Sequence, residues 1–410
     1  MKPSLETPPI HCLSASAIAA AVAARRLSAV QVVMAHLERI AAVNPQINAL
    51  VQISRDEALN APLAADAQVA CGGPLGPLHG VPFTVKDVID VAGVVGAAGM
   101  PERVDFTPTR DAVVVARMKA AGAILLGKTN CPPGGSGGET DNPVYGCTRN
   151  PYDLARSPGG SSGGEAAAVA AGLSAIGIGT DSGGSLRLPA HFCGIVTLKP
   201  TVGRVPSTGV LNHPGGLSDV RTQIGVLGRT VRDVALAWPL LAGVDGQDSG
   251  VVPMPLPSAV PVKLAALRVA LYTDDGIATP TPETAEALQA AGDALRSAGI
   301  AVERARPASL HDAAPITQRY WAMDELSGRE VQQLLADWDR FHSQMLAFMS
   351  AFDAIVCPVD AGPAPRCGEA RSTLFSYTLP FSLCGWPGAV VRIGTGREGL
   401  PIGDHGTTLA

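Results

Sequence analysis

Two glycine-rich loops and one lysine supply the residue types from which a hydrolytic site could be built. Lys86 ends a short β-rich run, Ser161 lies in the loop 157–165, and Ser185 lies in the loop 179–190. A serine hydroxyl is a weak nucleophile, so it needs a neighbouring group that takes its proton. A lysine can be that group, provided that its amine is neutral. The three residues therefore indicate serine-based hydrolysis.

Lys86 must be buried if its amine is to be neutral near pH 7–8. The ordinary lysine pKa of about 10.4 would have to fall by roughly 3 units, which costs the ammonium form on the order of 4 kcal/mol. Burial away from water can produce such a shift. Val85, Val88 and Ile89 provide an apolar setting. A lysine beside Asp87 is more often a solvated surface pair, but the strand context favours a buried base.

The second loop offers consecutive backbone N–H groups at Ser182, Gly183 and Gly184. Glycines let such a turn approach a ligand without a clash of Cβ atoms. The turn is therefore predicted to form an oxyanion hole, in which the loss of one donor typically raises the barrier by roughly 3 kcal/mol. Three further residues are predicted to hold the loops in place: Ser162, Asp181 and Arg187.

Together these motifs resemble the amidase signature family of serine hydrolases, in its amidase and urethanase-like branch. The resemblance covers nearly all of residues 12–402, with weaker detail from about 251 to 350. Three other motifs contribute to it: Gly-Val-Pro-Phe-Thr-Val-Lys-Asp at 80–87, Asp-Asn-Pro-Val-Tyr-Gly at 141–146, and Leu-Lys-Pro-Thr at 198–201.

The resemblance implies a Ser-cisSer-Lys triad that cleaves acyl C–N bonds through a covalent acyl-enzyme intermediate. Ser185 would be the nucleophile, Ser161 a bridging serine on a cis peptide after Gly160, and Lys86 the base. The implied substrates are small amides and anilides, with carbamates, urethanes and esters as further candidates. No cofactor is expected. The run Pro-Gly-Gly-Ser-Gly-Gly at 133–138 predicts a wide, mobile acyl side of the pocket that suits bulky carbamates or anilides. The pocket residues proposed on this basis are Gly134, Gly135 and Tyr145.

Two other functions remain open from the sequence. Some members of the family are subunits of a tRNA-dependent amidotransferase, in which the chain would release ammonia within a complex. The segment 122–129 also matches the phosphate-loop pattern GxxxxGK[ST]. That pattern needs a flexible loop followed by a helix, whereas this segment reads as a hydrophobic strand followed by two prolines. A nucleotide-binding protein is therefore the remote alternative.

Other nucleophiles and bases are weaker candidates. Ser185 could pair with a histidine, but no Gly-x-Ser-x-Gly elbow surrounds it, and a structural histidine is favoured at His191. Nothing near Cys131 or Cys193 would lower the pKa of the thiol. The other histidines weighed as partners of Ser185 are His79 and His213.

The secondary-structure elements that must position these residues alternate between helices and strands along the chain. Two helices are expected over 15–43, with Ser28 capping the second, followed by strands at 80–86, 123–126 and 175–179. The later part repeats the pattern, including a long helical segment over 317–352. An α/β fold is predicted, with a mixed, largely parallel sheet flanked by helices on both faces.

A single domain is expected over residues 1–410. It would comprise N-terminal helices (1–75), the signature core (76–250), and a second α/β part with a helical cap (251–410). The prolines between 253 and 261 are the best candidate for a linker. After 399–403 a further strand and helix are expected, so the ending at 404–410 suggests a shortened C-terminus that lacks a sheet edge and a covering helix.

The composition limits the classes of binding partner that can be expected. The net charge is −5 and no run of Lys or Arg occurs, so neither nucleic acid nor a membrane surface is expected to bind. The longest apolar stretch, 166–179, is too short to span a bilayer. Eight scattered cysteines without CxxC spacing favour reduced thiols, a cytoplasmic location and no metal site. A homodimer is left open.

Overall fold

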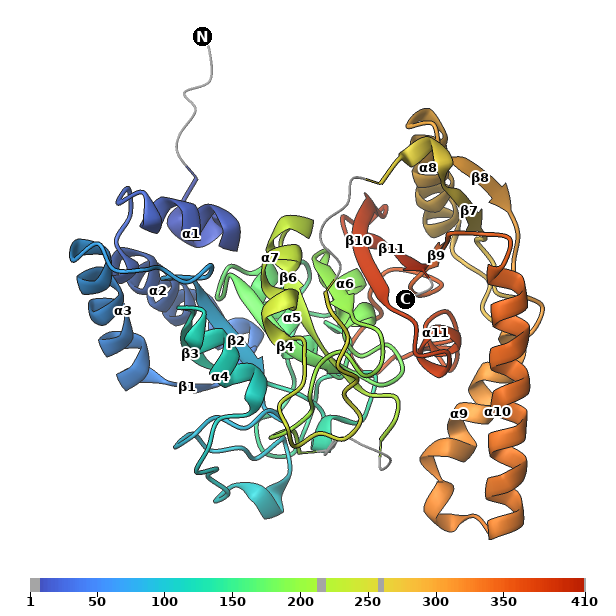
Figure 1. Ribbon diagram of the computed structural model, residues 1–410, viewed down its shortest axis with the longest axis horizontal. Helices are drawn as coiled ribbons and strands as arrows, with labels where there is room; N and C mark the ends of the chain where they lie inside the picture. The colour runs from blue at the N-terminus through green and yellow to red at the C-terminus, as the bar shows by residue number, and fades with distance from the viewer. Residues whose placement is uncertain (1–7, 212–218, 257–261, 409–410) are drawn as a thin grey trace.

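The computed structural model describes residues 8–211, 219–256 and 262–408, and Figure 1 shows their arrangement. The strands are β1 (Leu50–Ile53), β2 (Pro82–Lys86), β3 (Ile124–Thr129), β4 (Ile176–Asp181), β5 (Val196–Lys199), β6 (Gln223–Gly228), β7 (Arg268–Leu271), β8 (Ala301–Arg304), β9 (Ala354–Pro358), β10 (Gly388–Thr395) and β11 (Pro401–Thr408). The α-helices are α1 (Ala15–Ala23), α2 (Ala29–Ile47), α3 (Arg55–Ala70), α4 (Val113–Ala120), α5 (Gly163–Ala170), α6 (Arg187–Cys193), α7 (Val231–Leu241), α8 (Pro282–Ser297), α9 (Ala313–Trp321), α10 (Gly328–Met349) and α11 (Leu379–Leu383).

All the named strands belong to one sheet of eleven, in the order β1-β3-β2-β4-β6-β5-β10-β11-β9-β7-β8. The predicted mixed sheet is confirmed, but parallel pairing is found in only four of the ten described strand pairs. The four are β2–β3, β2–β4, β7–β8 and β7–β9. Parallel neighbours such as β2 and β3 are joined through a helix, whereas β10 and β11 form a hairpin and must pair antiparallel.

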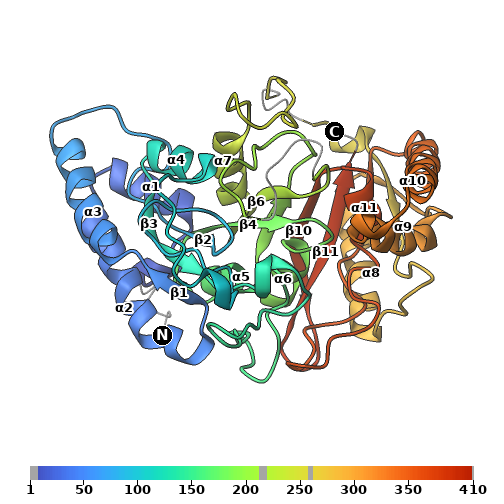
Figure 2. The ribbon, with the colours of Figure 1, turned by 90° about the horizontal axis from the view of Figure 1, so that it is seen from below.

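Helices cover both faces of the sheet, as predicted. Successive side chains of a strand point to opposite faces, so Leu125 of β3 packs with α1, α4 and α7, whereas Ile124 and Leu126 pack with α2, α3 and α5. Figure 2 shows α4 and α7 on one side of β4 and β6, with α5 and α6 on the other. The core therefore lies in two layers, one on each side of the sheet.

The N-terminal part contains more than the two predicted helices. Ser28 does cap α2, and it forms a reciprocal pair of hydrogen bonds with Gln31. Beyond α2 the chain adds β1, which pairs antiparallel with β3 at one edge of the sheet, and then α3. This part is therefore joined to the signature core by strand pairing as well as by helix packing.

The second α/β part shares the same sheet, because β10 pairs with β5. Ala270 of β7 packs toward α9, α10 and α11, while Val269 and Leu271 pack toward α8. The predicted helical segment over 317–352 is interrupted, since α9 ends at Trp321 and Ser327 caps α10 through the backbone N–H of Glu330. We call these two helices the cap, and they lie side by side in Figure 1.

The C-terminal segment departs from expectation. Residues 404–408 belong to β11, which lies inside the sheet between β10 and β9. The expectation that a sheet strand is missing there is wrong, because alternate residues of this segment, including His405 and Thr407, are buried as a strand requires. The candidate linker lies partly outside the described residues, and its described portion up to Leu256 forms no helix or strand.

Candidate active site

Lys86, Ser161 and Thr180 meet where two neighbouring strands end. Lys86 is the last residue of β2 and Thr180 lies one residue before the end of β4, and these strands pair in parallel. Functional groups commonly gather at the carboxyl ends of such strands. The Nζ atom of Lys86 lies 2.6 Å from Ser161 Oγ and 2.8 Å from Thr180 Oγ1. All three side chains are buried.

Ser161 and Ser185 face one cavity of about 460 Å³, which Thr180, Ser182 and Gly183 also line. The Gly160–Ser161 peptide is cis, as expected from the resemblance. A glycine is needed at 160, because a Cβ atom there would lie 2.7 Å from the carbonyl oxygen of Gly137. The backbone N–H of Ser162 donates to the carbonyl of Ser185 at 3.1 Å, so the two serine loops are directly bonded.

Burial controls the ionisation of Lys86. Removal from water disfavours the ammonium form and lowers the pKa of Lys86 to about 8, although nearby groups, including Asp181 and Glu165, oppose the shift. The Glu165 carboxyl accepts hydrogen bonds from Thr129 at 2.7 Å and Thr84 at 2.8 Å, and burial still raises its pKa to about 8. Lys86 can therefore be neutral at mildly alkaline pH.

Asp181 and Arg187 form a buried, bidentate ion pair next to the glycine turn at 182–184. Arg187 Nε and Nη2 each lie 2.9 Å from a carboxylate oxygen of Asp181. Although burial alone would raise the pKa of Asp181, the charge and hydrogen bonds of Arg187 lower it to about 2. Ser162 braces the strand end, because its hydroxyl donates to Thr180 O at 3.1 Å. The pair keeps the carboxylate ionised and anchors both ends of the turn.

Large side chains from the cap and from the segment before α11 complete the cavity wall. They are Tyr320, Trp321, Met323 and Phe375. The Trp321 side chain is 56% exposed. It also reaches the turn, since a Cβ atom placed on Gly183 would lie 3.5 Å from its ring. The cavity thus offers a planar apolar surface beside the glycine turn.

Only one of the three predicted pocket residues lines this cavity. Gly135 does so, together with Ser136 and Gly137. The backbone N–H of Gly134 donates to Ala98 instead, and the Tyr145 hydroxyl accepts a hydrogen bond from Gln52 at 3.2 Å. The pocket assignment of Gly134 and Tyr145 is therefore not supported by the structure, because neither lines the cavity.

Sequence reasoning missed several residues around the site. Thr180 could have been found, because it stands one residue before the predicted supporting residue Asp181 at the end of a strand next to Lys86. Glu165 carried a weaker signal, as an acidic residue in an otherwise apolar, alanine-rich helix. No sequence signal pointed to Tyr320, Trp321 or Phe375, since these residues lie more than a hundred positions beyond the serine loops.

The phosphate-loop alternative does not fit the structure. Ile124–Thr129 is β3, a buried strand, and Lys128 is committed to an ion pair with Asp87 Oδ1 at 3.0 Å. Residues 130–162, all of which the structure describes, contain no α-helix between the motif and α5. A phosphate would therefore meet neither a free lysine nor a helix N-terminus at this place.

The other candidate nucleophiles and bases are structural in the described chain. His191 is buried, with Nδ1 accepting from Gly403 N–H at 2.8 Å and Nε2 lying 3.1 Å from Gly362 O. His79 is likewise bonded, through Nε2 to Ala65 O at 3.0 Å. Burial raises the pKa of both Cys131 and Cys193, so each thiol stays protonated. His213 lies outside the described residues.

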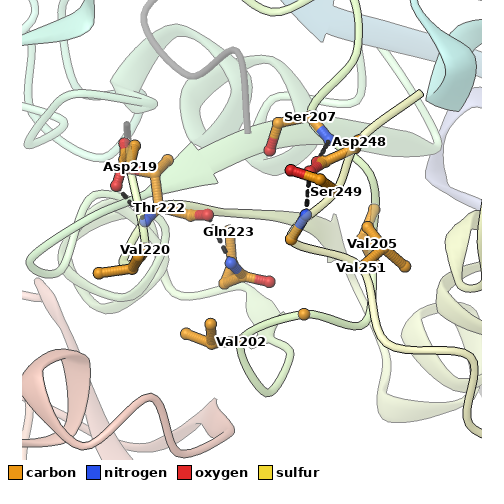
Figure 3. Close-up of a pocket in the computed structure, with 12 residues that line it drawn as sticks. Val202, Val205, Ser207, Asp219, Val220, Thr222, Gln223, Asp248, Ser249 and Val251 are labelled. Atoms are coloured by element: carbon orange, nitrogen blue, oxygen red, sulfur yellow. Dashed lines mark hydrogen bonds between the residues drawn. The ribbon is translucent and has the colours of Figure 1, made fainter. Parts of the chain in front are cut away.

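A smaller cavity of about 140 Å³ lies next to the first, and Asp219 lines both. Figure 3 shows its walls, with Asp219 and Asp248 on opposite sides and with Val202, Val205 and Val251 among the other lining residues. Both carboxylates accept backbone N–H groups, from Thr222 and Ser207 among others. No lysine or histidine is among the described residues that line it.

A family model described as Amidase matches residues 31–334, and the chain belongs to this family. The chain is 35% identical over 437 residues to the indoleacetamide hydrolase of Bradyrhizobium diazoefficiens, with 96% of this chain and 83% of the relative covered. It is 34% identical over 442 residues to an acylamidase of Rhodococcus erythropolis, with 96% and 91% covered. The protein is thus an amidase signature hydrolase that acts on amides.

Solved structures agree on the fold. The structure of 6-aminohexanoate cyclic dimer hydrolase complexed with substrate superposes with a TM-score of 0.84 at 28% identity, covering 98% of this chain and 94% of the other. A bacterial aryl acylamidase of the amidase signature family gives a TM-score of 0.83 at 27% identity, with 98% and 93% covered. The predicted α/β fold is therefore confirmed.

Membrane-spanning helices and clustered metal ligands are both absent from the described ranges. None of the helices there combines the length and the apolar character that crossing a membrane requires. Within the same ranges, no group of three or more His, Cys, Asp or Glu side chains is placed to hold a metal ion.

Proposed function

We propose that Ser185 attacks the acyl carbon of an amide, with Ser161 and Lys86 removing its proton. The observation that supports this most directly is the 2.6 Å contact of Lys86 Nζ with Ser161 Oγ, at a cavity that Ser185 also lines. In the proposed step, Ser185 Oγ gives its proton to Ser161 Oγ, which passes its own proton to neutral Lys86. The new C–O bond forms as the carbonyl π electrons move to oxygen.

Collapse of the tetrahedral intermediate completes acylation. The C–N bond breaks as the nitrogen takes a proton from Lys86 through Ser161. The amine departs, and the acyl group remains bound to Ser185 as an ester. Water then attacks this ester as its proton passes through Ser161 to Lys86. The proton returns through Ser161 to Ser185 Oγ as the ester C–O bond breaks and the acid is released. We propose that the backbone N–H groups of Ser182, Gly183 and Gly184 stabilise the oxyanion in both halves.

Trapping the intermediate tests this proposal. With an activated aryl ester, product release should show a burst of one equivalent per active site, because acylation by such an ester is faster than hydrolysis of the acyl-enzyme. Rapid acid quench and peptide mass spectrometry should then find the acyl group on the peptide that contains Ser185. An acyl group on another residue, or hydrolysis without any covalent adduct, would reject the proposed nucleophile.

We propose bulky, apolar amides and anilides as substrates, with carbamates and esters as secondary ones. The support is the wall formed by Tyr320, Trp321, Met323 and Phe375, which can stack on a planar group. Another part of the rim is built from small residues at 135–137. The names of two relatives, an indoleacetamide hydrolase and an aryl acylamidase, fit the same chemistry.

Ser136 gives a test of pocket width. Its backbone is extended (φ −108°, ψ 116°) and its side chain is exposed, so a larger residue fits without backbone strain, whereas Gly135 has φ of 73°. Ser136→Leu should lower kcat/KM for a bulky anilide roughly 10-fold, while a small primary amide stays within about twofold. Ser136→Ala is the matched control. Equal effects on both substrates would contradict a wide rim that admits bulky groups.

A second candidate function is ammonia release within an amidotransferase complex. The chain is 41% identical over 296 residues to a glutamyl-tRNA(Gln) amidotransferase subunit of Roseiflexus sp., covering 72% of this chain and 60% of the relative. Turnover of glutamine only in the presence of a stoichiometric, co-purifying partner would favour this function. Turnover of anilides by the isolated chain would favour the first. A homodimer and a cytoplasmic location stay predictions from sequence.

A further inference from the structure

We propose that Thr378 and Arg221 are positioning residues that aim the backbone N–H groups of the oxyanion turn. This inference rests on the proposed function, in which Gly183 and Gly184 bind the developing oxyanion. Both side chains approach the turn from behind, and each bonds a different carbonyl of it. Neither residue belongs to the motifs that the sequence singles out.

Thr378 holds the peptide unit that joins Gly183 to Gly184. Its hydroxyl is fully buried and lies 2.6 Å from the carbonyl oxygen of Gly183, to which it donates. Thr378 is itself fixed, because its own carbonyl accepts from Arg187 Nη1 at 2.9 Å. A Cβ atom at position 184 would come within 2.4 Å of this hydroxyl, so the approach requires glycine there.

Arg221 holds the preceding peptide unit, which joins Ser182 to Gly183. Its Nη2 atom donates to the carbonyl oxygen of Ser182 at 3.1 Å, and only 1% of the residue is exposed. Within the described chain, its Nε and Nη1 atoms have no hydrogen-bond partner. The guanidinium lies over the rings of Tyr320 and Trp321, at 5.0 and 5.6 Å from their centroids. The charge is thus held by aromatic faces and directed at one carbonyl.

The geometry of the peptide unit turns these contacts into an effect on catalysis. A trans peptide is planar, so its C=O and N–H bonds point in opposite directions. A donor that fixes the carbonyl of Ser182 also fixes the direction of the Gly183 N–H, and Thr378 does the same for the Gly184 N–H. Hydrogen bonds in series polarise one another, so each N–H becomes a stronger donor toward the oxyanion. Arg221 adds a full positive charge to this effect.

Thr378→Val removes the hydroxyl at nearly constant shape. Because the N–H of Gly184 would be weakened and less well aimed but not deleted, kcat should fall roughly 10-fold, with KM within about twofold. Thr378→Ser keeps the hydroxyl and should restore at least half of the wild-type kcat. Arg221→Met should also lower kcat by roughly 10-fold or more, and Arg221→Lys should recover part of it.

Thr197→Val is the matched control, because Thr197 is also fully buried and its hydroxyl donates to a backbone carbonyl, that of Val226, at 2.8 Å. It should lose a similar amount of thermal stability with kcat unchanged. The affinity for a trifluoromethyl ketone, which forms a tetrahedral adduct with serine, should fall in Thr378→Val in proportion to kcat. The affinity for the product acid should not change.

Three results would overturn the inference. One is an unchanged kcat in Thr378→Val, the second is an equal loss of kcat in Thr197→Val, and the third is a loss that Thr378→Ser does not rescue. These outcomes are distinct from failure of the proposed function. If Ser185 is acylated by substrate while Thr378→Val behaves as wild type, only the positioning role fails. If no acyl group forms on Ser185, the proposed function fails first.

Discussion

Ser185→Ala is expected to reduce amide hydrolysis by at least about 10⁴-fold, because the variant lacks the atom that is proposed to form the acyl-enzyme. The fold should tolerate the change. Ser185 is only half-buried, and its hydroxyl makes no hydrogen bond to any described residue, so no buried polar group loses a partner. The melting temperature should therefore stay close to that of the wild type.

The decisive measurement is a panel of anilide, carbamate, ester and primary-amide substrates run against wild type and Ser185→Ala. Every substrate that the wild type cleaves should be lost together, since one nucleophile serves them all. Ser182→Ala is a suitable control, because Ser182 lines the same cavity and is proposed to contribute only its backbone. If Ser185→Ala kept a tenth of the activity on any substrate, a different nucleophile would have to act on it.

Lys86→Met is expected to lower kcat/KM about 10³-fold or more, since general base catalysis accounts for factors of this size. Methionine has a similar length and no charge to desolvate. The melting temperature should therefore change little, even though Ser161 and Thr180 each lose a donor within 2.8 Å.

The pH dependence gives the same prediction a second readout. Burial lowers the pKa of Lys86 to about 8, and only the neutral amine can accept a proton. In the wild type, kcat/KM should therefore rise with pH up to about 8 and then level off. In Lys86→Met, the residual kcat/KM should show neither this rise nor the levelling near pH 8.

Lys199→Met is the matched control for Lys86. Lys199 is also fully buried, burial lowers its pKa to about 7, and its Nζ donates to the carbonyl of Pro200 at 2.9 Å. It does not line the cavity, so its replacement should leave the rise near pH 8 in place. A wild-type profile that is flat between pH 6 and 9, or a plateau that persists in Lys86→Met, would contradict a role for Lys86 as the base.

Part of the site could be predicted because its residues lie in short, chemically distinctive stretches. The loops around Ser161 and Ser185 are rich in glycine, and the structure brings Lys86 to the first serine as the resemblance implied. Asp181 and Arg187 are only six residues apart, so their pairing across one turn was accessible from sequence. Helix ends with a local signal, such as Ser28, were predictable for the same reason.

The predictions that failed depended on contacts between distant segments. Whether 404–408 would form a strand was decided by β10 and β9, which offer unpaired backbone groups on both sides. The direction of most strand pairs likewise follows from which strands become neighbours, and hydrophobic pattern alone does not reveal that. Tyr145 lies in one of the motifs on which the resemblance rests, yet its hydroxyl accepts a hydrogen bond from Gln52.

The sequence by itself indicated the candidate reacting groups and their immediate neighbours, because covalent proximity and residue type are enough to recognise a glycine turn with its serines. The tertiary structure alone decided what surrounds them. Thr378 lies 195 residues from Gly183 in the chain, and Arg221 lies 39 from Ser182. Packing of α11 against the sheet brings Thr378 to Gly183. The antiparallel pairing of β4 with β6, in which Asp181 lies opposite Gln223, brings Arg221 to Ser182. No local pattern records which carbonyl each side chain will meet.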